Sequence, residues 1–145
     1  MTLLKLKPST IDIDFTGPKQ DIEDFRRAES DLHHGYRIDT WTDGDIFSTS
    51  LPGDYLSKSI LIDSDLTRIE LRALSPLDIV VTKASRLNAR DWQDIETCIT
   101  KEKLTAEEIL SRSQEVGYAG NDEVYQDSIK SIINRFDKHE NNQSP

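Results

Sequence analysis

Residues 10–15 read Thr-Ile-Asp-Ile-Asp-Phe, and this short stretch decides how the first half of the chain is interpreted. Apolar and acidic side chains alternate with a period of two, which is typical of a β-strand with one face on a core. Asp12 and Asp14 are therefore expected to project together from the opposite face. The side chains expected to face the core are those of Ile11, Ile13 and Phe15.

Further elements are predicted on the C-terminal side of this strand. Pro18 marks the first turn of an amphipathic helix that ends before Gly35. Residues 36–41 alternate again and lead through a hairpin-type turn at 42–45. The remaining short strands are expected at residues 46–47, 60–62 and 67–73.

The second half of the chain has helical periodicity. Residues 75–78, Ser-Pro-Leu-Asp, combine an N-cap serine with a proline at the first helical position. Thr105 and Glu108 have the spacing of a capping box at the start of a later helix. The helices expected after residue 90 cover residues 91–99, 105–116 and 122–136.

These patterns predict one α+β domain over residues 1–136, with a small mixed β-sheet and a helical C-terminal half. Residues 1–73 are expected to be mainly sheet with one helix, and residues 75–136 to be helical. Residues 137–145 are interpreted as a polar tail.

The composition restricts the possible partners. The chain has 145 residues, a formal net charge of -9 and no apolar run close to the ~20 residues that span a bilayer. An acidic surface repels phosphate backbones, so we expect no non-specific DNA binding and no membrane association. Without an apolar leader the protein is expected to be cytoplasmic. The single Cys98 is interpreted as a small buried hydrophobe rather than a reactive thiol.

Asp12 and Asp14 are the first candidates for chemistry. Two carboxylates on one face of a strand repel each other unless a positive charge lies between them, and Mg²⁺ is commonly bound by one or two carboxylates together with phosphate oxygens. Asp39, on the second predicted strand, could bring a third carboxylate to the same face. The alternative is that all three carboxylates belong to solvated strand faces.

A local excess of positive charge follows in the sequence. Residues 66–90 hold five basic and two acidic side chains, a net charge of +3. Lys83, Arg86 and Arg90 have the spacing i, i+3, i+7 and are predicted to form one helical stripe that could hold a polyphosphate. The alternative is a solvated helix edge with ion pairs to Asp91 and Asp94.

Three segments together resemble a known family. They read K-P-S-T-I-D-I-D at residues 7–14, L-P-G-D-Y at 51–55 and L-R-A-L-S-P-L-D-I-V-V-T-K-A-S-R-L-N-A-R-D-W-Q-D at 71–94. Over residues 5–115 the chain resembles bacterial and archaeal nucleotidyltransferase-like proteins of the DNA polymerase β superfamily. Within that superfamily it is similar to the branch related to the toxin component of abortive-infection toxin-antitoxin systems.

The resemblance implies a function for each candidate. Asp12 and Asp14, completed by Asp39, would bind the Mg²⁺ ions, or alternatively Mn²⁺, that carry a nucleoside triphosphate. The residues that would contact phosphate and order the site are Lys83, Arg86, Arg90, Asp91 and Asp94. The implied reaction is transfer of a nucleotide to a hydroxyl of an RNA or a protein, with pyrophosphate leaving.

The chain departs from the family pattern before Thr10. Family members carry an N-terminal helix and strand ending in a Gly-Gly or Gly-Ser motif, whereas the nine residues before Thr10 contain no glycine. Three explanations are open: a truncated start, a site completed by another subunit, or a member that binds without catalysing. The chain is thus interpreted either as an enzyme or as a non-catalytic binding or regulatory module that acts through an antitoxin-like protein partner or as a homodimer.

Overall fold

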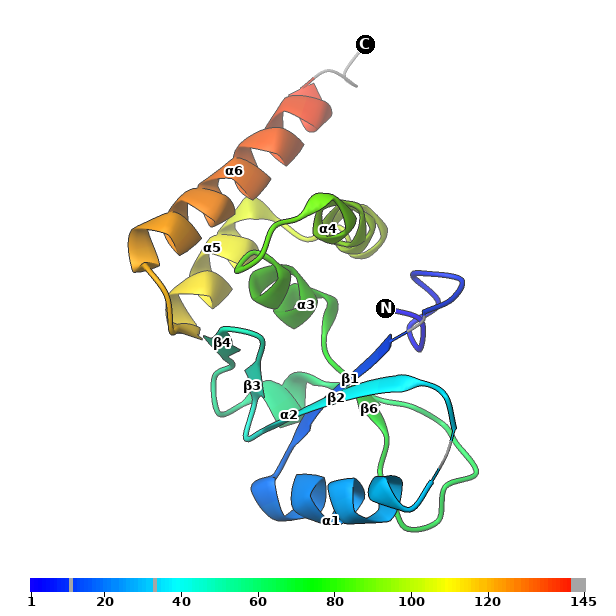
Figure 1. The fold of residues 1–145 in the computed structure, drawn as a ribbon. Coiled ribbons are helices and arrows are strands. Elements are labelled where there is room, and N and C mark those ends of the chain that lie inside the picture. Colours follow the sequence, from blue (N-terminus) through cyan, green and yellow to red (C-terminus); the bar gives the residue numbers. More distant parts are fainter. Residues whose placement is uncertain (11, 33, 142–145) are drawn as a thin grey trace.

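The computed structural model describes residues 1–10, 12–32 and 34–141, with side chains described as far as Phe136. The prediction for Ile11 and the end of the predicted tail, residues 142–145, lie outside the described residues. The fold is α+β, as the sequence predicts. All but one of the described strands lie in residues 12–73, and the helices of residues 76–141 gather at the other end of the molecule (Figure 1).

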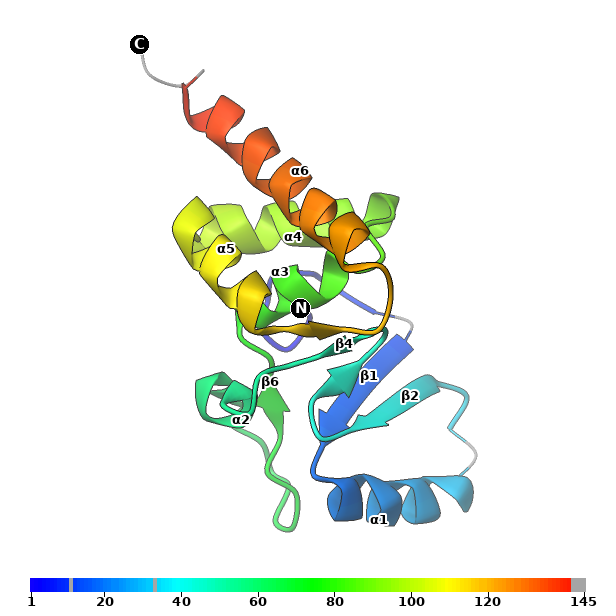
Figure 2. The same cartoon turned by 90° about the vertical axis from the view of Figure 1, so that its left-hand side faces the viewer.

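A two-stranded parallel sheet carries the first strand motif. Strand β1, Asp12–Gly17, pairs with β2, Arg37–Thr42, and helix α1, Lys19–Ser30, connects them. Helix α1 runs along the same end of the molecule as the two strands (Figure 2), and the rings of Phe15 and Phe25 lie 5.1 Å apart. The predicted burial of this strand face is only partly right. Ile13 is 36% exposed, because a single helix against a two-stranded sheet leaves the start of β1 uncovered.

A three-stranded antiparallel sheet joins the two halves of the chain. Strand β4, Thr49–Ser50, pairs with β3, Asp45–Ile46, on one side and with β7, Gly117–Tyr118, on the other. The turn predicted at 42–45 is present, with positive φ at Asp43 and Gly44. The hairpin predicted there is wrong, since β3 pairs with β4 instead of with β2.

The third sheet is shorter than the sequence suggests. Strand β5, Ile60–Leu61, pairs antiparallel with β6, Arg72–Ala73, and the short helix α2, Tyr55–Lys58, precedes them. The single mixed sheet expected from the sequence is thus divided into one parallel and two antiparallel sheets within the described residues.

The helical half begins where the caps predict. Helix α3, Pro76–Lys83, starts with Ser75 accepting a hydrogen bond from the backbone N–H of Asp78 at 3.0 Å. Thr105 and Glu108 form the predicted capping box of α5, Ala106–Glu115. Helix α4 covers Ala89–Glu102 and α6 covers Asp122–Asn141, so α6 continues into the segment predicted as a polar tail.

The main hydrophobic core lies among these helices. Tyr125 is buried and donates a hydrogen bond from its hydroxyl to the carbonyl of Val81 at 3.0 Å, which connects α6 to α3. Among residues 1–10, 12–32 and 34–141, no helix is long and apolar enough to cross a membrane. The largest fully buried aliphatic side chains of the core are Val80, Val81, Ile95, Ile109, Ile129 and Ile132.

Candidate functional site

The register of the parallel sheet places the three predicted carboxylates on one face. Asp14 lies directly opposite Asp39, and Asp12 lies opposite Arg37. Residues two apart on a strand, and residues paired between parallel strands, project to the same side. We call the side formed by Asp12, Asp14 and Asp39 the acidic face. It also carries Arg37, whose guanidinium is 2.8 Å from a carboxylate oxygen of Asp39.

The charges around Asp14 act in opposite directions. Asp14 is exposed, but partial desolvation by its neighbours raises the pKa of its carboxyl above its ordinary value, and the charges of Asp12 and Asp39 raise it further. The positive charges of Arg86 and Lys83 oppose this shift. The acidic face therefore disfavours its own ionised form, and a cation at this position would relieve that cost.

The donors of the acidic face suit a hard divalent cation that also binds a substrate. Within the described part of the chain, no three His, Cys, Asp or Glu side chains are grouped so that they could hold a metal ion. Mg²⁺ does not require such a cage, because it commonly keeps waters and uses one or two carboxylates plus phosphate oxygens. Asp14 and Asp39, opposite each other in the register, provide a carboxylate pair of that kind.

The basic residues do not form the predicted helical stripe. Helix α3 ends at Lys83, Arg86 lies in the following turn and Arg90 is in the first turn of α4. The helix is interrupted because Asn88 caps α4, accepting hydrogen bonds from the backbone N–H groups of Arg90 and Asp91 at 3.0 Å each. The prediction of one continuous stripe is therefore wrong, and Arg90 is exposed on another element.

Lys83 and Arg86 are nevertheless brought together by two carboxylates. The ammonium group of Lys83 lies 3.0 Å from Asp91 and 2.9 Å from Asp94, and the guanidinium of Arg86 lies 2.9 Å from Asp91. We call these four residues the ion-pair cluster. The ion pairs to Asp91 and Asp94 that the alternative interpretation expects are thus formed by Lys83 and Arg86, whereas Arg90 does not enter the cluster among the described residues.

Asp91 is the centre of this cluster. Its side chain is 1% exposed. Burial alone would raise the pKa of Asp91, but the hydrogen bonds from Lys83 and Arg86 outweigh it, so the pKa lies below its ordinary value. The carboxylate also accepts a bond from the backbone N–H of Asn88 at 3.3 Å and completes the capping box of α4. Asp91 thereby fixes both cations to the start of α4.

Two aromatic side chains connect the cluster with the acidic face. The guanidinium carbon of Arg86 lies 3.6 Å from the centre of the Phe47 ring, and Phe47 meets Trp41 edge-on with their centres 5.1 Å apart. Trp41 is two residues beyond Asp39 on β2 and so projects from the same face. No local pattern in the sequence indicates either ring as part of the site, because the contact between Arg86 and Phe47 joins residues that are 39 positions apart.

The N-terminal segment also reaches the cluster. The ammonium group of Lys7 lies 3.3 Å from a carboxylate oxygen of Asp94, which binds Lys83 as well. No local pattern in the sequence predicts this contact, since the two residues are 87 positions apart.

Cys98 is excluded as a reactive group at this site. The side chain is fully buried, and burial raises the pKa of its thiol to about 12. The thiolate that nucleophilic chemistry needs is therefore scarce near neutral pH, and the interpretation of Cys98 as a buried hydrophobe is confirmed.

Comparison with known proteins identifies a family for the chain. A family model described as nucleotidyltransferase of unknown function (DUF6036) matches residues 2–142. The searches of the curated proteins and of the solved structures give no match.

Proposed function

The chain belongs to this family of nucleotidyltransferases of unknown function, and on this premise we propose that it transfers a nucleotide from a nucleoside triphosphate to a hydroxyl of an RNA or a protein. The observation that carries the proposal is the arrangement of the acidic face beside the cations of the ion-pair cluster. Because the chain resembles the toxin-related branch of the polymerase β superfamily, we propose that this activity belongs to a toxin-antitoxin type of system in the cytoplasm.

Asp14 and Asp39 are the proposed carboxylate pair for Mg²⁺ or Mn²⁺, with Asp12 beside them on the acidic face. When bound, the metal would offset the charge that develops on the α-phosphate and the leaving pyrophosphate. The raised pKa of Asp14 supports this role, since crowded carboxylates gain most from a bound cation. Arg37 already balances part of the charge of Asp39.

Lys83 and Arg86 are the proposed contacts for the triphosphate. An ammonium group has three donors, and two of those of Lys83 point to Asp91 and Asp94, which leaves one for a phosphate oxygen. Asp91 and Asp94 act as positioning residues that hold these cations. Arg90, exposed on the first turn of α4, is proposed as an outer contact to phosphate.

The experiment measures labelling of acceptors with an α-phosphate-labelled nucleoside triphosphate in the presence of Mg²⁺. The D12N/D14N double variant should lose labelling and metal-dependent nucleotide binding. A matched control is D63N/D65N, which removes an Asp-x-Asp pair of the same spacing from an exposed turn. Equal labelling by all three proteins, each with wild-type circular dichroism, would refute the proposal.

A second function is favoured by the pairing of the cations. Lys83 and Arg86 are already neutralised by carboxylates, which is the state expected of a domain that no longer binds phosphate. In that case the chain is a non-catalytic module with a nucleotidyltransferase fold that acts through an antitoxin-like protein or a second copy of itself. Light scattering and co-purification test this alternative, which predicts a stoichiometric complex and no Mg²⁺-dependent nucleotide binding.

A further inference from the structure

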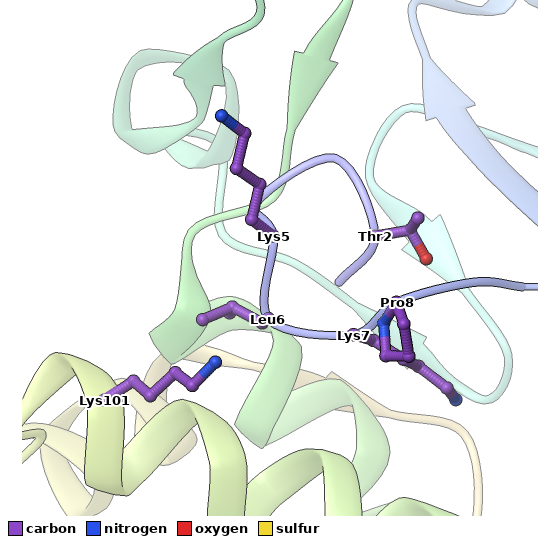
Figure 3. A pocket seen from close by; sticks show the side chains of 6 residues that line it. All are labelled: Thr2, Lys5, Leu6, Lys7, Pro8 and Lys101. Atoms are coloured by element: carbon purple, nitrogen blue, oxygen red, sulfur yellow. The ribbon is translucent and has the colours of Figure 1, made fainter.

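A shallow hollow lies between the N-terminal segment and the end of α4, and it adjoins the ion-pair cluster through Lys7. Its volume is about 350 Å³. Three of its lining side chains are lysines, and none of the described lining residues is acidic, although the chain has a net charge of -9. The hollow is lined by Thr2, Lys5, Leu6, Lys7, Pro8 and Lys101 (Figure 3). It is therefore a local positive region on a negative protein.

The hollow is connected to the ion-pair cluster. Lys7 lines the hollow and binds Asp94, and Asp94 in turn binds Lys83. A chain of alternating charges thus runs from the hollow towards the acidic face. Lys5 and Lys101 are exposed, and neither takes part in an ion pair among the described residues, so their charges are available to a ligand.

The arrangement of the lysines distinguishes between possible ligands. Figure 3 shows the amino groups of Lys5, Lys7 and Lys101 pointing in different directions instead of towards one point. A single phosphate ion would need converging donors, whereas a strand with successive phosphates can meet cations that are spread over a surface. Lys5 and Lys101, which make no ion pair among the described residues, also favour a phosphate backbone over a mixed-charge protein surface.

We propose that this lysine hollow binds the phosphate backbone of a single-stranded RNA segment and so guides the acceptor towards the acidic face. The inference rests on the proposed function, because it identifies RNA as the class of acceptor for that same site. Lys5, Lys7 and Lys101 are binding residues in this assignment, and the transfer chemistry stays with the acidic face.

The number of lysines sets the expected salt dependence. Single-stranded binding that neutralises Z phosphates has a slope of about -0.7Z in a plot of log K against log salt, so three lysines give about -2. Raising KCl from 50 to 200 mM should weaken binding about 20-fold. With Lys5 and Lys101 replaced by glutamine, the slope should become shallower, about -0.7, and the same increase in salt should weaken binding about 3-fold.

The test measures binding of a fluorescently labelled 12-nucleotide single-stranded RNA to the full chain by fluorescence anisotropy. The buffer contains EDTA and no nucleoside triphosphate, so metal-dependent nucleotide binding does not contribute. The proposal expects the steep slope for the wild type and the shallow slope for K5Q/K101Q. A charge-matched control, K19Q/K130Q, removes two exposed lysines on α1 and α6 and should keep the wild-type slope.

Three results would overturn the inference. They are no RNA binding by the wild type at 50 mM KCl, an equal slope for wild type and K5Q/K101Q, and complete displacement of RNA by tripolyphosphate at equal charge concentration, which would indicate a site for free polyphosphate. Because the binding assay contains no nucleoside triphosphate, RNA binding and nucleotide transfer can fail independently. Loss of labelling with intact salt-dependent RNA binding would refute the proposed function alone.

Discussion

Replacement of Asp91 by asparagine tests whether the ion-pair cluster holds the site together. The substitution keeps the size of the side chain but removes the charge shared by Lys83 and Arg86. Breaking a buried ion pair by removing one partner costs about 3–5 kcal/mol. Lys83 keeps Asp94 as a partner and Arg86 is partly exposed, so we expect the lower end, about 3 kcal/mol of unfolding free energy.

The assay is urea unfolding followed by tryptophan fluorescence, for which Trp92 on α4 is a nearby reporter. With an m-value of about 2 kcal/mol/M, a loss of about 3 kcal/mol lowers the midpoint by about 1.5 M. A control is D24N on α1, which breaks the exposed pair with Arg27 and should cost less than about 1 kcal/mol.

The lowered pKa of Asp91 also predicts how the difference in unfolding free energy between wild type and D91N changes with pH. The pKa of Asp91 is lowered in the folded protein, so the folded state binds this proton less readily than the unfolded chain does. Its stabilisation is therefore complete above the unfolded pKa of about 4 and is lost as the pH falls through the folded pKa. The difference between wild type and D91N should be largest at pH 7 and shrink towards pH 3. A difference below about 1 kcal/mol at pH 7, or one that does not change with pH, would refute the reasoning.

Three further predictions concern residues outside the cluster. Arg112→Met should lower the unfolding free energy by about 2–3 kcal/mol, because it leaves the fully buried Asp78 without the cation that lies 2.7 Å away. Part of this cost is offset, since the substitution also removes a buried guanidinium nitrogen that has no hydrogen-bond partner among the described residues. A double-mutant cycle with Asp78→Asn measures the coupling between the two side chains. Gly44→Ala should cost about 1–3 kcal/mol in urea unfolding, since Gly44 has φ 87° and an added Cβ would lie 2.9 Å from the ring of Tyr55. Cys98, with a thiol pKa of about 12, should react with a thiol reagent about 10³-fold more slowly in the folded than in the unfolded protein at pH 8, and equal rates would contradict its burial.

The parts of the fold that were predictable depend on local interactions. Ser75 and Thr105 cap their helices through contacts only three residues away, so their sequence spacing contains the whole signal. The alternation in β1 likewise predicted a strand with its two aspartates on one face. The error at residues 83–90 also has a local origin, because the cap of α4 at Asn88 competes with continuation of α3, and Leu87 adopts a positive φ between them.

The parts that were not predictable depend on contacts between distant residues. Neither Lys7 nor Asp94 has a local pattern that indicates their pairing, and Arg112 meets Asp78 across 34 positions. The candidate site depends on both kinds of information. The motifs in the sequence identify its charged residues, but the parallel register that places Asp14 opposite Asp39 cannot be inferred from either strand alone.

The pairing of Lys83 and Arg86 with Asp91 determines how a triphosphate could bind at all. A bare triphosphate approaching the acidic face would meet three carboxylates, and the two cations beside them are already largely neutralised. Coulomb repulsion between like charges 4 Å apart is about 4 kcal/mol near a protein surface, so the nucleotide must bring positive charge with it. We therefore expect nucleotide binding to require a divalent cation in the wild type. In D12N/D14N the repulsion is reduced, so any residual nucleotide affinity should no longer depend on Mg²⁺. Calorimetric titration with and without Mg²⁺ checks this, and metal-independent binding by the wild type would contradict it.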